Sequence, residues 1–533
     1  MKVVSIIMNA KTHLEKAIVL NPEFAEAYFE LGMLLKGDGD IKESIKTLRK
    51  AVSINNDYAE AQCELAIALT IDDDLEEARN HFLNSLEINP NYAHAYFNYA
   101  LLLIKINDTE EAKNNFDKVT EINQNFAPAY YFKATLLINA DDYEDARKNY
   151  ETAIDIDEKY IDAHYSMGKL LAGGVATNKE GTLVDRTNIA GAKSHFDIVL
   201  KLNKKNEKAH YNLAKILCIE KNYDLAKDHL LKALEINDGY SKAHYLIAYV
   251  YEESNEIEKA KSHYTLSLKF HQENALSHFR LGVIQSNNKE FKKAEEHLKK
   301  AILIDPHQSE AHFHLALLLR NDDDPSLAKK HFFKALEINP EYAIAYYELA
   351  HHSEKNGDFN EAKIHFQRAT DVEQNYVDAY FNLARISKSP SEHDQAVRNY
   401  ETALEINPNM ADCHYWFAKL LTSGERLTND GTLLKEPKID EAEKHFNRAI
   451  KINPKFAKAY YRLGLLLYSK NSYLSALNNF EHAIKLDPNF SKAHYSLAVL
   501  LMNKEASKVI EKELLLGEKK PRSRNSSLAK KAK

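Results

Sequence analysis

Histidine is the residue type with the greatest chemical capacity in this sequence, because imidazole binds metal ions and exchanges protons near neutral pH. The chain of 533 residues contains 24 histidines. Many of them recur at two regularly spaced sites: His164, His210, His244, His278, His312, His414 and His494 at the first, and His81, His195, His229, His263, His297, His331, His365 and His445 at the second. A zinc site needs three or four ligands that converge at about 2 Å from the ion. Because each site recurs at long intervals, we interpret these histidines as packing and hydrogen-bonding groups and expect no cofactor.

Other residues that could perform catalysis also lack the required arrangements. The sequence contains no GxxxxGK, GxSxG or HExxH motif, which would mark a phosphate-binding loop, a serine hydrolase or a zinc protease. Cys63, Cys218 and Cys413 lie far apart and form no CxxC pair, so we interpret them as reduced thiols of a cytosol-like compartment. The chain is therefore predicted to be no enzyme and to have no small-molecule substrate.

The histidines belong to a repeat that extends along nearly the whole chain. The pattern Ala-[Tyr/His]-aromatic-x-Leu-[Gly/Ala] recurs every 34 residues, with two steps of 46 residues after His164 and His414. The second position of the pattern, here called the marker, falls at Tyr28, Gln62, Tyr96, Tyr130, His164, His210, His244, His278, His312, Tyr346, Tyr380, His414, Tyr460 and His494. Such regularity indicates a repeat architecture.

Each repeat is predicted to contain two amphipathic helices. In the second repeat, the first helix is expected at about 60–70 and the second helix at Leu75–Ile88, with aspartates at 72–74 capping the second helix. A small residue on the second helix is followed four residues later by a bulky ring, as in Ala78 and Phe82. Small residues that face large ones are what close helix packing requires.

These residues resemble the tetratricopeptide repeat family. The family pattern matches Tyr96, Ala100, Ala112 and Phe116, and its closing proline matches Pro90, Pro306, Pro340, Pro408, Pro454 and Pro488. The resemblance covers residues from about 10 to 504. It implies an all-α fold, an α–α superhelix of paired antiparallel helices, in which the first helices line a concave groove that binds peptides or extended protein segments.

Two specialised grooves of this family can be compared residue by residue. The long array resembles the repeat region of the O-linked N-acetylglucosamine transferases, whose groove carries an asparagine ladder. Glu30 and Phe132 stand at ladder sites here, and no glycosyltransferase domain follows. Lys458 and Arg462 resemble one element of the carboxylate clamp of chaperone-binding members, but Trp416 stands where that clamp needs asparagine. Neither specificity transfers to this chain.

The spacing predicts an order of segments along the chain. A half repeat or cap helix is expected at 1–24, followed by four repeats at 25–160 and a fifth repeat at 161–206 with an insertion at about 173–185. Six repeats are expected at 207–410, a twelfth repeat at 411–456 with an insertion at about 423–435, and a thirteenth repeat at 457–490. A terminal helix and cap at 491–516 and a basic disordered tail at 517–533 are expected to complete the order.

The two insertions resemble each other at an offset of 250 residues, as do their flanks, so a block of seven repeats with its insertion was duplicated. Asn429-Asp430-Gly431 between two β-prone segments indicates a tight turn. We expect each insertion to form a short β-hairpin. Two roles stay open for these hairpins, a tolerated surface loop and a paired docking element.

The aromatic residue after each marker is the candidate for contact with a bound protein segment. The candidates are Phe97, Tyr131, Tyr165, Tyr211, Tyr245, Phe279, Phe313, Tyr347, Phe381 and Tyr415, joined by Lys458 and Arg462. Packing between neighbouring first helices is the alternative role for these rings. Acidic residues at Glu26, Glu30, Glu60 and Glu64 and basic residues at Lys458, Arg462 and Lys492 predict a groove of opposite charge at its two ends.

These features favour a non-catalytic scaffold that binds other proteins. The alternative is the targeting arm of a larger enzyme, such as a glycosyltransferase, whose catalytic part is absent from this chain. Nucleic-acid binding is disfavoured by the net charge of −7, no apolar run is long enough to span a membrane, and homodimerisation stays open. The expected location is the cytoplasm, with the basic tail as a potential nuclear-import signal.

Overall fold

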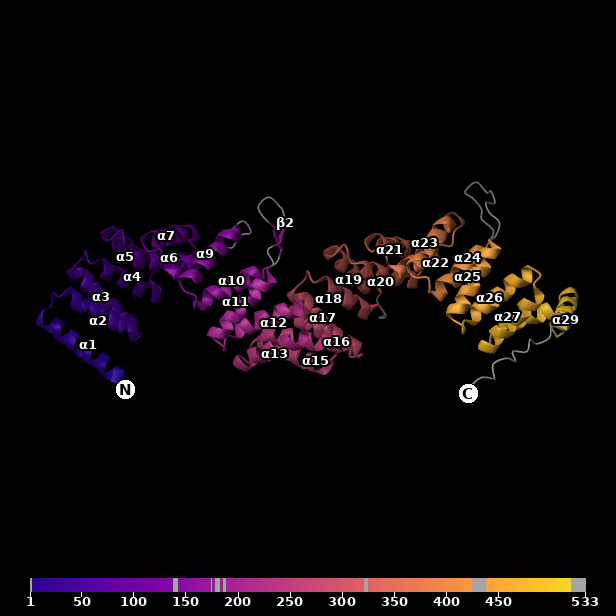
Figure 1. Cartoon of the computed structure of the whole chain (residues 1–533), viewed down its shortest axis with the longest axis horizontal. Coiled ribbons are helices and arrows are strands. Elements are labelled where there is room, and N and C mark those ends of the chain that lie inside the picture. The colour runs from indigo at the N-terminus through magenta and orange to yellow at the C-terminus, as the bar shows by residue number, and fades with distance from the viewer. Residues whose placement is uncertain are drawn as a thin grey trace, which may run out of the picture. The chain divides into compact units, whose positions relative to one another are not determined.

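The computed structural model describes residues 2–137, 142–173, 175–177, 183–185, 188–320, 325–423 and 438–518. The chain divides into unit 1, Met1–Gln272, and unit 2, Glu273–Lys533. Within each unit, consecutive helices pack as antiparallel pairs, and most of them are joined by short turns (Figure 1). The described residues therefore confirm the predicted all-α helical repeat.

Unit 1 begins with α1 (Lys2–Leu20), which packs on α2. Helix pairs follow in chain order: α2 (Ala25–Gly37) and α3 (Ile41–Ile54), α4 (Ala59–Ile71) and α5 (Leu75–Ile88), α6 (Ala93–Lys105) and α7 (Thr109–Ile122), α8 (Ala127–Leu136) and α9 (Tyr143–Ile156), α10 (Ile161–Leu171) and α11 (Ile189–Leu202), α12 (Glu207–Ile219) and α13 (Tyr223–Ile236), and α14 (Ser241–Glu253) and α15 (Ile257–Phe270).

Unit 2 continues the same pairing. Its pairs are α16 (Ala275–Asn287) and α17 (Phe291–Ile304), α18 (Ser309–Leu319) and α19 (Pro325–Ile338), α20 (Ala343–Lys355) and α21 (Phe359–Val372), α22 (Val377–Ile386) and α23 (His393–Ile406), α24 (Ala411–Thr422) and α25 (Ile439–Ile452), α26 (Ala457–Ser469) and α27 (Tyr473–Leu486), and α28 (Ser491–Met502) and α29 (Lys504–Glu518).

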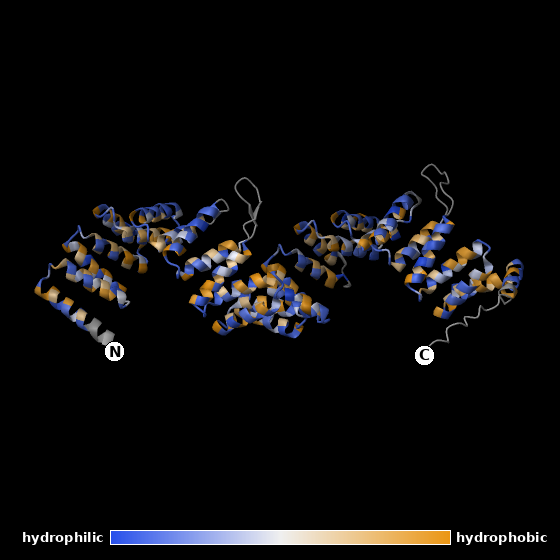
Figure 2. Cartoon of the chain, in the orientation of Figure 1, coloured by the Kyte–Doolittle hydropathy of each residue, from blue (hydrophilic) through white to orange (hydrophobic). Residues whose placement is uncertain are grey.

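The core of each pair is built from small residues opposite large ones. Polar and apolar residues alternate around the helices, so each helix has an apolar side to bury (Figure 2). A β-carbon at Gly168 of α10 would lie 2.9 Å from the ring of Phe196 on α11. That ring is fully buried, as are Phe82 and Phe116 at the matching sites of other repeats. The small residue is therefore what lets the two helices of a repeat approach each other.

The turn within a repeat differs from the prediction in one detail. Asp74 precedes α5, but its side chain makes no capping hydrogen bond, so the prediction that the aspartates at 72–74 cap this helix is wrong. The neighbouring Asp73 instead adopts a left-handed conformation with φ of 70°, which reverses the chain. Aspartates do cap other second helices, and Asp108 accepts a hydrogen bond from the Glu111 amide at 3.3 Å.

The first insertion contains the expected hairpin strands. Strands β1 (Val175–Thr177) and β2 (Leu183–Asp185) pair antiparallel, with Ala176 opposite Val184. The second insertion, at about 423–435, and the basic tail lie almost entirely outside the described residues.

The C-terminal end contains a helix that the repeat pattern did not separate. After α28, Asn503 accepts a hydrogen bond from the Glu505 amide at 3.0 Å and so caps α29. Helix α29 packs against α27 and α28 and buries Ala506 and Ile510. Within the part of the chain that the structure describes, none of the helices combines the length and apolar character that a bilayer crossing requires.

Candidate protein-binding surface

In several repeats, the aromatic residue that follows the marker packs against a ring at the start of the next repeat. The ring centroids of Phe97 and Phe126 lie 5.0 Å apart, and those of Tyr347 and Tyr376 also lie 5.0 Å apart. The same contact joins Tyr131 to Tyr160, Tyr211 to Tyr240, Phe313 to Tyr342, and Tyr415 to Phe456. Such ring pairs stabilise by about 0.5–1.5 kcal/mol beyond their buried area. The rings therefore hold consecutive repeats together.

The burial of these candidate residues agrees with a packing role. Phe279, Phe313 and Tyr415 are buried. The other aromatic candidates are half-buried: Phe97, Tyr131, Tyr165, Tyr211, Tyr245, Tyr347 and Phe381. Little of each ring is left for a ligand, so contact between this ladder of rings and a bound segment remains a prediction.

Two tyrosines of the ladder reach the next first helix through their hydroxyl groups. In unit 1, Asn212 Nδ2 donates a hydrogen bond to Tyr165 Oη at 3.0 Å. In unit 2, Asn382 Nδ2 donates to Tyr347 Oη at 3.3 Å. Burial raises the pKa of Tyr347 to about 12, so its hydroxyl stays protonated at neutral pH.

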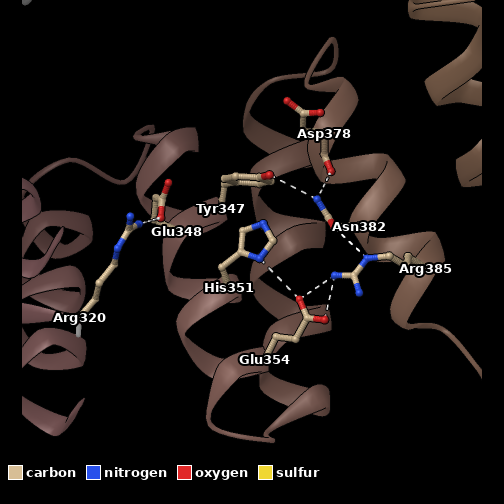
Figure 3. Close-up of polar contacts among 8 residues, drawn as sticks. All are labelled: Arg320, Tyr347, Glu348, His351, Glu354, Asp378, Asn382 and Arg385. Carbon is tan, nitrogen blue, oxygen red and sulfur yellow. Dashed lines mark hydrogen bonds and ion pairs between the residues drawn. The ribbon is translucent and has the colours of Figure 1, made fainter. Parts of the chain in front are cut away.

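A polar network on α20 and α22 extends from this tyrosine (Figure 3). Arg385 Nη2 donates to both carboxylate oxygens of Glu354 at 2.8 Å, and Arg385 Nε donates to Asn382 Oδ1 at 3.0 Å. His351 Nδ1 lies 3.5 Å from the same carboxylate. The repeat pattern did not indicate this network. Glu354 and Arg385 stand on successive first helices, and that placement was the signal that could have found it.

An open hollow of about 530 Å³ lies beside the network. It is lined by Arg320, Glu348, His351, His352, Glu354, Lys355 and Phe359. Within this lining, Arg320 Nη1 donates to Glu348 Oε2 at 2.6 Å (Figure 3). Charged groups of both signs therefore face this hollow.

The acidic end of the predicted groove, in unit 1, is partly neutralised within the protein. Glu64 is buried, and its carboxylate contacts both Lys36 and His94. Burial alone would raise the pKa of Glu64, but the hydrogen bonds from His94 and Lys36 hold it below its ordinary value. Glu26 and Glu60 remain exposed on their first helices.

The basic end lies in unit 2 on α26 and its neighbours. Lys458 is exposed and Arg462 is half-buried. On α24, the ammonium group of Lys419 lies 4.3 Å from the centre of the Trp416 ring, which is a cation–π contact.

The recurring histidines of the two sites meet as pairs inside the repeats. Their Nδ1 atoms lie 2.8–3.0 Å apart in the pairs His164–His195, His210–His229, His244–His263, His278–His297, His312–His331 and His414–His445. Each pair shares one hydrogen bond, as the hydrogen-bonding interpretation expected. Among the described residues, no three histidine, cysteine or acidic side chains are placed to hold a metal ion.

The repeats match known family models along most of the chain. Models of the tetratricopeptide repeat match residues 25–58, 69–136, 138–173, 207–240, 241–272, 275–308, 309–342, 343–376 and 457–490, which is more than half of the chain. The chain belongs to the tetratricopeptide repeat family. Residues 387–472 of this tetratricopeptide repeat protein also match the model of regulator of microtubule dynamics proteins 1–3.

Three of the solved structures that resemble this tetratricopeptide repeat protein cover nearly its full length. The anaphase-promoting complex hetero-tetramer Cut9–Hcn1 is 16% identical, covers 93% of this chain and 94% of its own, and has a TM-score of 0.35. Naa15/Naa10 bound to HypK-THB is 14% identical, with 97% and 100% covered and a TM-score of 0.34. Yeast Tom70 is 17% identical, with 92% and 99% covered and a TM-score of 0.32. No curated protein sequence has a significant match to this chain.

Proposed function

We propose that this tetratricopeptide repeat protein is a non-catalytic scaffold that binds extended segments of partner proteins along its first helices. The observation that carries the proposal is the hollow between α18, α20 and the start of α21. Its lining combines charged side chains of both signs with the apolar ring of Phe359. A surface of this mixed character can bind both the polar backbone and the side chains of a peptide, as protein interfaces do.

The network around Asn382 prepares this surface for binding. Asn382 is held by Tyr347, Arg385 and its own helix, where its Nδ2 also donates to Asp378 O at 2.9 Å. A side chain that is fixed before binding loses little conformational entropy when a ligand arrives. Through Arg385, the same network holds the carboxylate of Glu354, which lines the hollow.

Affinity capture from a lysate, followed by mass spectrometry, tests this function with a charge reversal in the hollow. Arg320→Glu changes the lining while leaving the buried rings in place. Lys330→Glu makes the same change of charge at an exposed site on the second helix α19 and serves as the matched control. We expect a defined set of proteins to be captured by the wild type and by the control and to be lost with Arg320→Glu. Equal capture by all three proteins would contradict the proposal.

A further inference from the structure

Five residues on the last four repeats of unit 2 form what we call the cationic surface: Lys388, Trp416, Lys419, Arg462 and Lys492. We propose that the cationic surface binds an acidic segment of a partner protein. This inference rests on the proposed scaffold function and names the chemistry of one of its ligands.

The cationic surface is built on successive first helices. Trp416 and Arg462 each follow the ladder aromatic of their repeat, on α24 and α26, and Lys419 lies one helical turn beyond Trp416. Lys388 follows the end of α22, and Lys492 lies in the first turn of α28. Helix α24 contacts α26, and α26 contacts α28. The register of the repeats therefore places Trp416, Lys419, Arg462 and Lys492 on neighbouring helices.

The cations of this surface have no ion-pair partner within the described part of the chain. Lysines and arginines nearby in unit 2 are paired: Arg385 with Glu354, Lys363 with Glu392, and Lys470 with Asp440 and Glu443. No ion pair to a described carboxylate involves Lys388, Lys419, Arg462 or Lys492. Lys388 lies 5.6 Å from the centre of the Phe359 ring, a contact that leaves its charge unneutralised, so four positive charges are left for a ligand.

The mutual repulsion of these charges is felt at Lys419. Its pKa is lowered first by burial and then by the positive charges of Arg462, Lys388 and Lys492. A bound carboxylate would relieve this repulsion, because opposite charges within a few ångströms stabilise the charged form of each group. Complementary charge also speeds and orients the binding of a flexible segment.

Trp416 provides a flat apolar wall beside the charges. Its ring is half-buried, and Lys419 lies over it at 4.3 Å. An acidic segment of a protein can therefore place its carboxylates on the cations and a methylene stem or peptide plane against the indole. Tryptophan and arginine are the residues that most often dominate protein interfaces.

Single-stranded nucleic acid fits this surface less well than an acidic protein segment. Sequence-tolerant binding of nucleic acid uses a series of exposed aromatic rings on which successive bases stack. Here Tyr415 packs against Phe456, and Tyr461 packs against Phe490 at 4.9 Å, so those rings are occupied between repeats. Trp416 alone among the five defining residues offers a ring to a base.

The first copy of the duplicated block offers a natural control. At the offset of 250 residues, Lys169 and Lys242 match Lys419 and Lys492, whereas Ser166 and Asn212 match Trp416 and Arg462. The side chain of Asn212 is already bound to the hydroxyl of Tyr165. The first copy therefore keeps two of the lysines but lacks both the indole and the arginine.

Trp416 also makes the test direct, because it is the single tryptophan of the chain. We would titrate the full chain with an acetylated and amidated hexaglutamate peptide and follow Trp416 fluorescence. A saturable change that weakens with added salt is the expected result. Lys419→Glu with Arg462→Glu should weaken binding by about tenfold or more, because two attractive contacts become repulsive.

Two controls keep the test specific. Lys169→Glu with Lys242→Glu, in the first copy, should leave the affinity for hexaglutamate unchanged. Arg462→Asn, which inserts the residue of the first copy, should weaken binding by a smaller factor, and circular dichroism should show native helix content for every variant.

Several results would overturn the proposal. Equal affinity of the wild type and the double charge reversal, or no saturable response at all, would remove the cationic surface as a binding site. Tighter binding of hexauridylate than of hexaglutamate would assign the surface to nucleic acid. If hexaglutamate fails while capture through the Arg320 hollow persists, this inference fails and the scaffold function stands; if that capture fails as well, both are contradicted.

Discussion

The Oε1 atom of Gln62 lies 2.6 Å from Nδ1 of His81, and this contact fixes which ring nitrogen of His81 carries the proton. An amide oxygen only accepts, so His81 carries its proton on Nδ1. Gln62 Nε2 in turn donates to the carbonyl of Asn56, six residues earlier. Where a histidine occupies the marker, its Nε2 contacts the equivalent carbonyl six residues earlier, as His312 does with Pro306 at 3.3 Å.

The histidine pairs follow the same scheme. His312 must carry its proton on Nε2 because the Pro306 carbonyl only accepts, and its Nδ1 then accepts from the Nδ1–H of His331. Glutamine thus imitates the neutral marker histidine. Adding a proton to His312 would place two donors face to face, 3.0 Å apart.

The first prediction is that acid destabilises the array through these pairs. Burial and the partner histidine lower the pKa of His331 to about 4, and burial likewise lowers those of His297 and His445 to about 4, against an ordinary value of about 6.5. Between these values the unfolded chain binds more protons than the folded chain. The stabilisation is therefore complete above about pH 6.5 and is lost as the pH falls towards 4.

The measurement is the melting temperature at pH 7.5 and at pH 5, followed by circular dichroism. We expect a loss on the order of 1 kcal/mol per pair across this range. Replacing His297, His331 and His445 with asparagine, which other repeats use at this site, should flatten the profile. A melting temperature that is constant between pH 5 and 8 in the wild type would contradict the role of the pairs.

The second prediction concerns the close approach of helices within a repeat. A β-carbon at Gly464 of α26 would lie 2.7 Å from the ring of Phe480. Gly464→Ala should therefore destabilise by about 1–3 kcal/mol in urea unfolding, because the ring must shift. Gly37→Ala meets no atom within 4 Å and should be neutral or stabilising by about 0.5 kcal/mol. Equal effects of the two changes would rule out the steric explanation.

The third prediction tests the ion pair between Arg385 and Glu354. Arg385→Lys keeps the charge but loses the fork that holds both carboxylate oxygens and Asn382, so it should destabilise by about 1–2 kcal/mol. The comparable Arg320→Lys affects a more exposed pair and should cost less than about 1 kcal/mol. Urea unfolding of both variants would separate the two cases. A larger loss of stability for Arg320→Lys than for Arg385→Lys would contradict the stronger role given to the Arg385–Glu354 pair.

The fourth prediction distinguishes packing from ligand contact in the aromatic ladder. Phe313 is only 4% exposed and packs against Tyr342, so Phe313→Ala should destabilise by about 3–5 kcal/mol whether or not a partner is present. Lys458→Ala, at an exposed site, should change stability by less than about 0.5 kcal/mol. If Phe313→Ala kept full stability and only reduced partner capture, the ring would contact a bound partner instead of packing between repeats.

Much of the fold could be predicted from the sequence because its determinants are local. The second helix of the second repeat was predicted at Leu75–Ile88, and α5 has the same bounds. Helix ends follow from turn residues and from apolar periodicity, and both are written in a few neighbouring positions. The pairing of small residues with rings, as in Gly168 and Phe196, was also readable because it recurs with every repeat.

The candidate site was less predictable because it depends on how one repeat packs on the next. The ladder rings were identified by spacing, but their orientation towards Phe126 or Tyr376 of the following repeat is set by helix packing and rotamers. The same holds for Glu354 with Arg385, which meet across two first helices. Histidine spacing likewise could not show that two imidazoles would share one proton.

The sequence by itself thus determined the repeat, its helices and its family. The 34-residue period and the alternation of small and large residues are visible in the sequence because they depend on contacts within one repeat. Tertiary structure alone decided which charges are neutralised. Glu64 meets Lys36 and His94, whereas Lys419 meets Trp416 and other cations. The physical reason is that Coulomb energy depends on distances between side chains of different repeats, and only the packing of those repeats sets these distances.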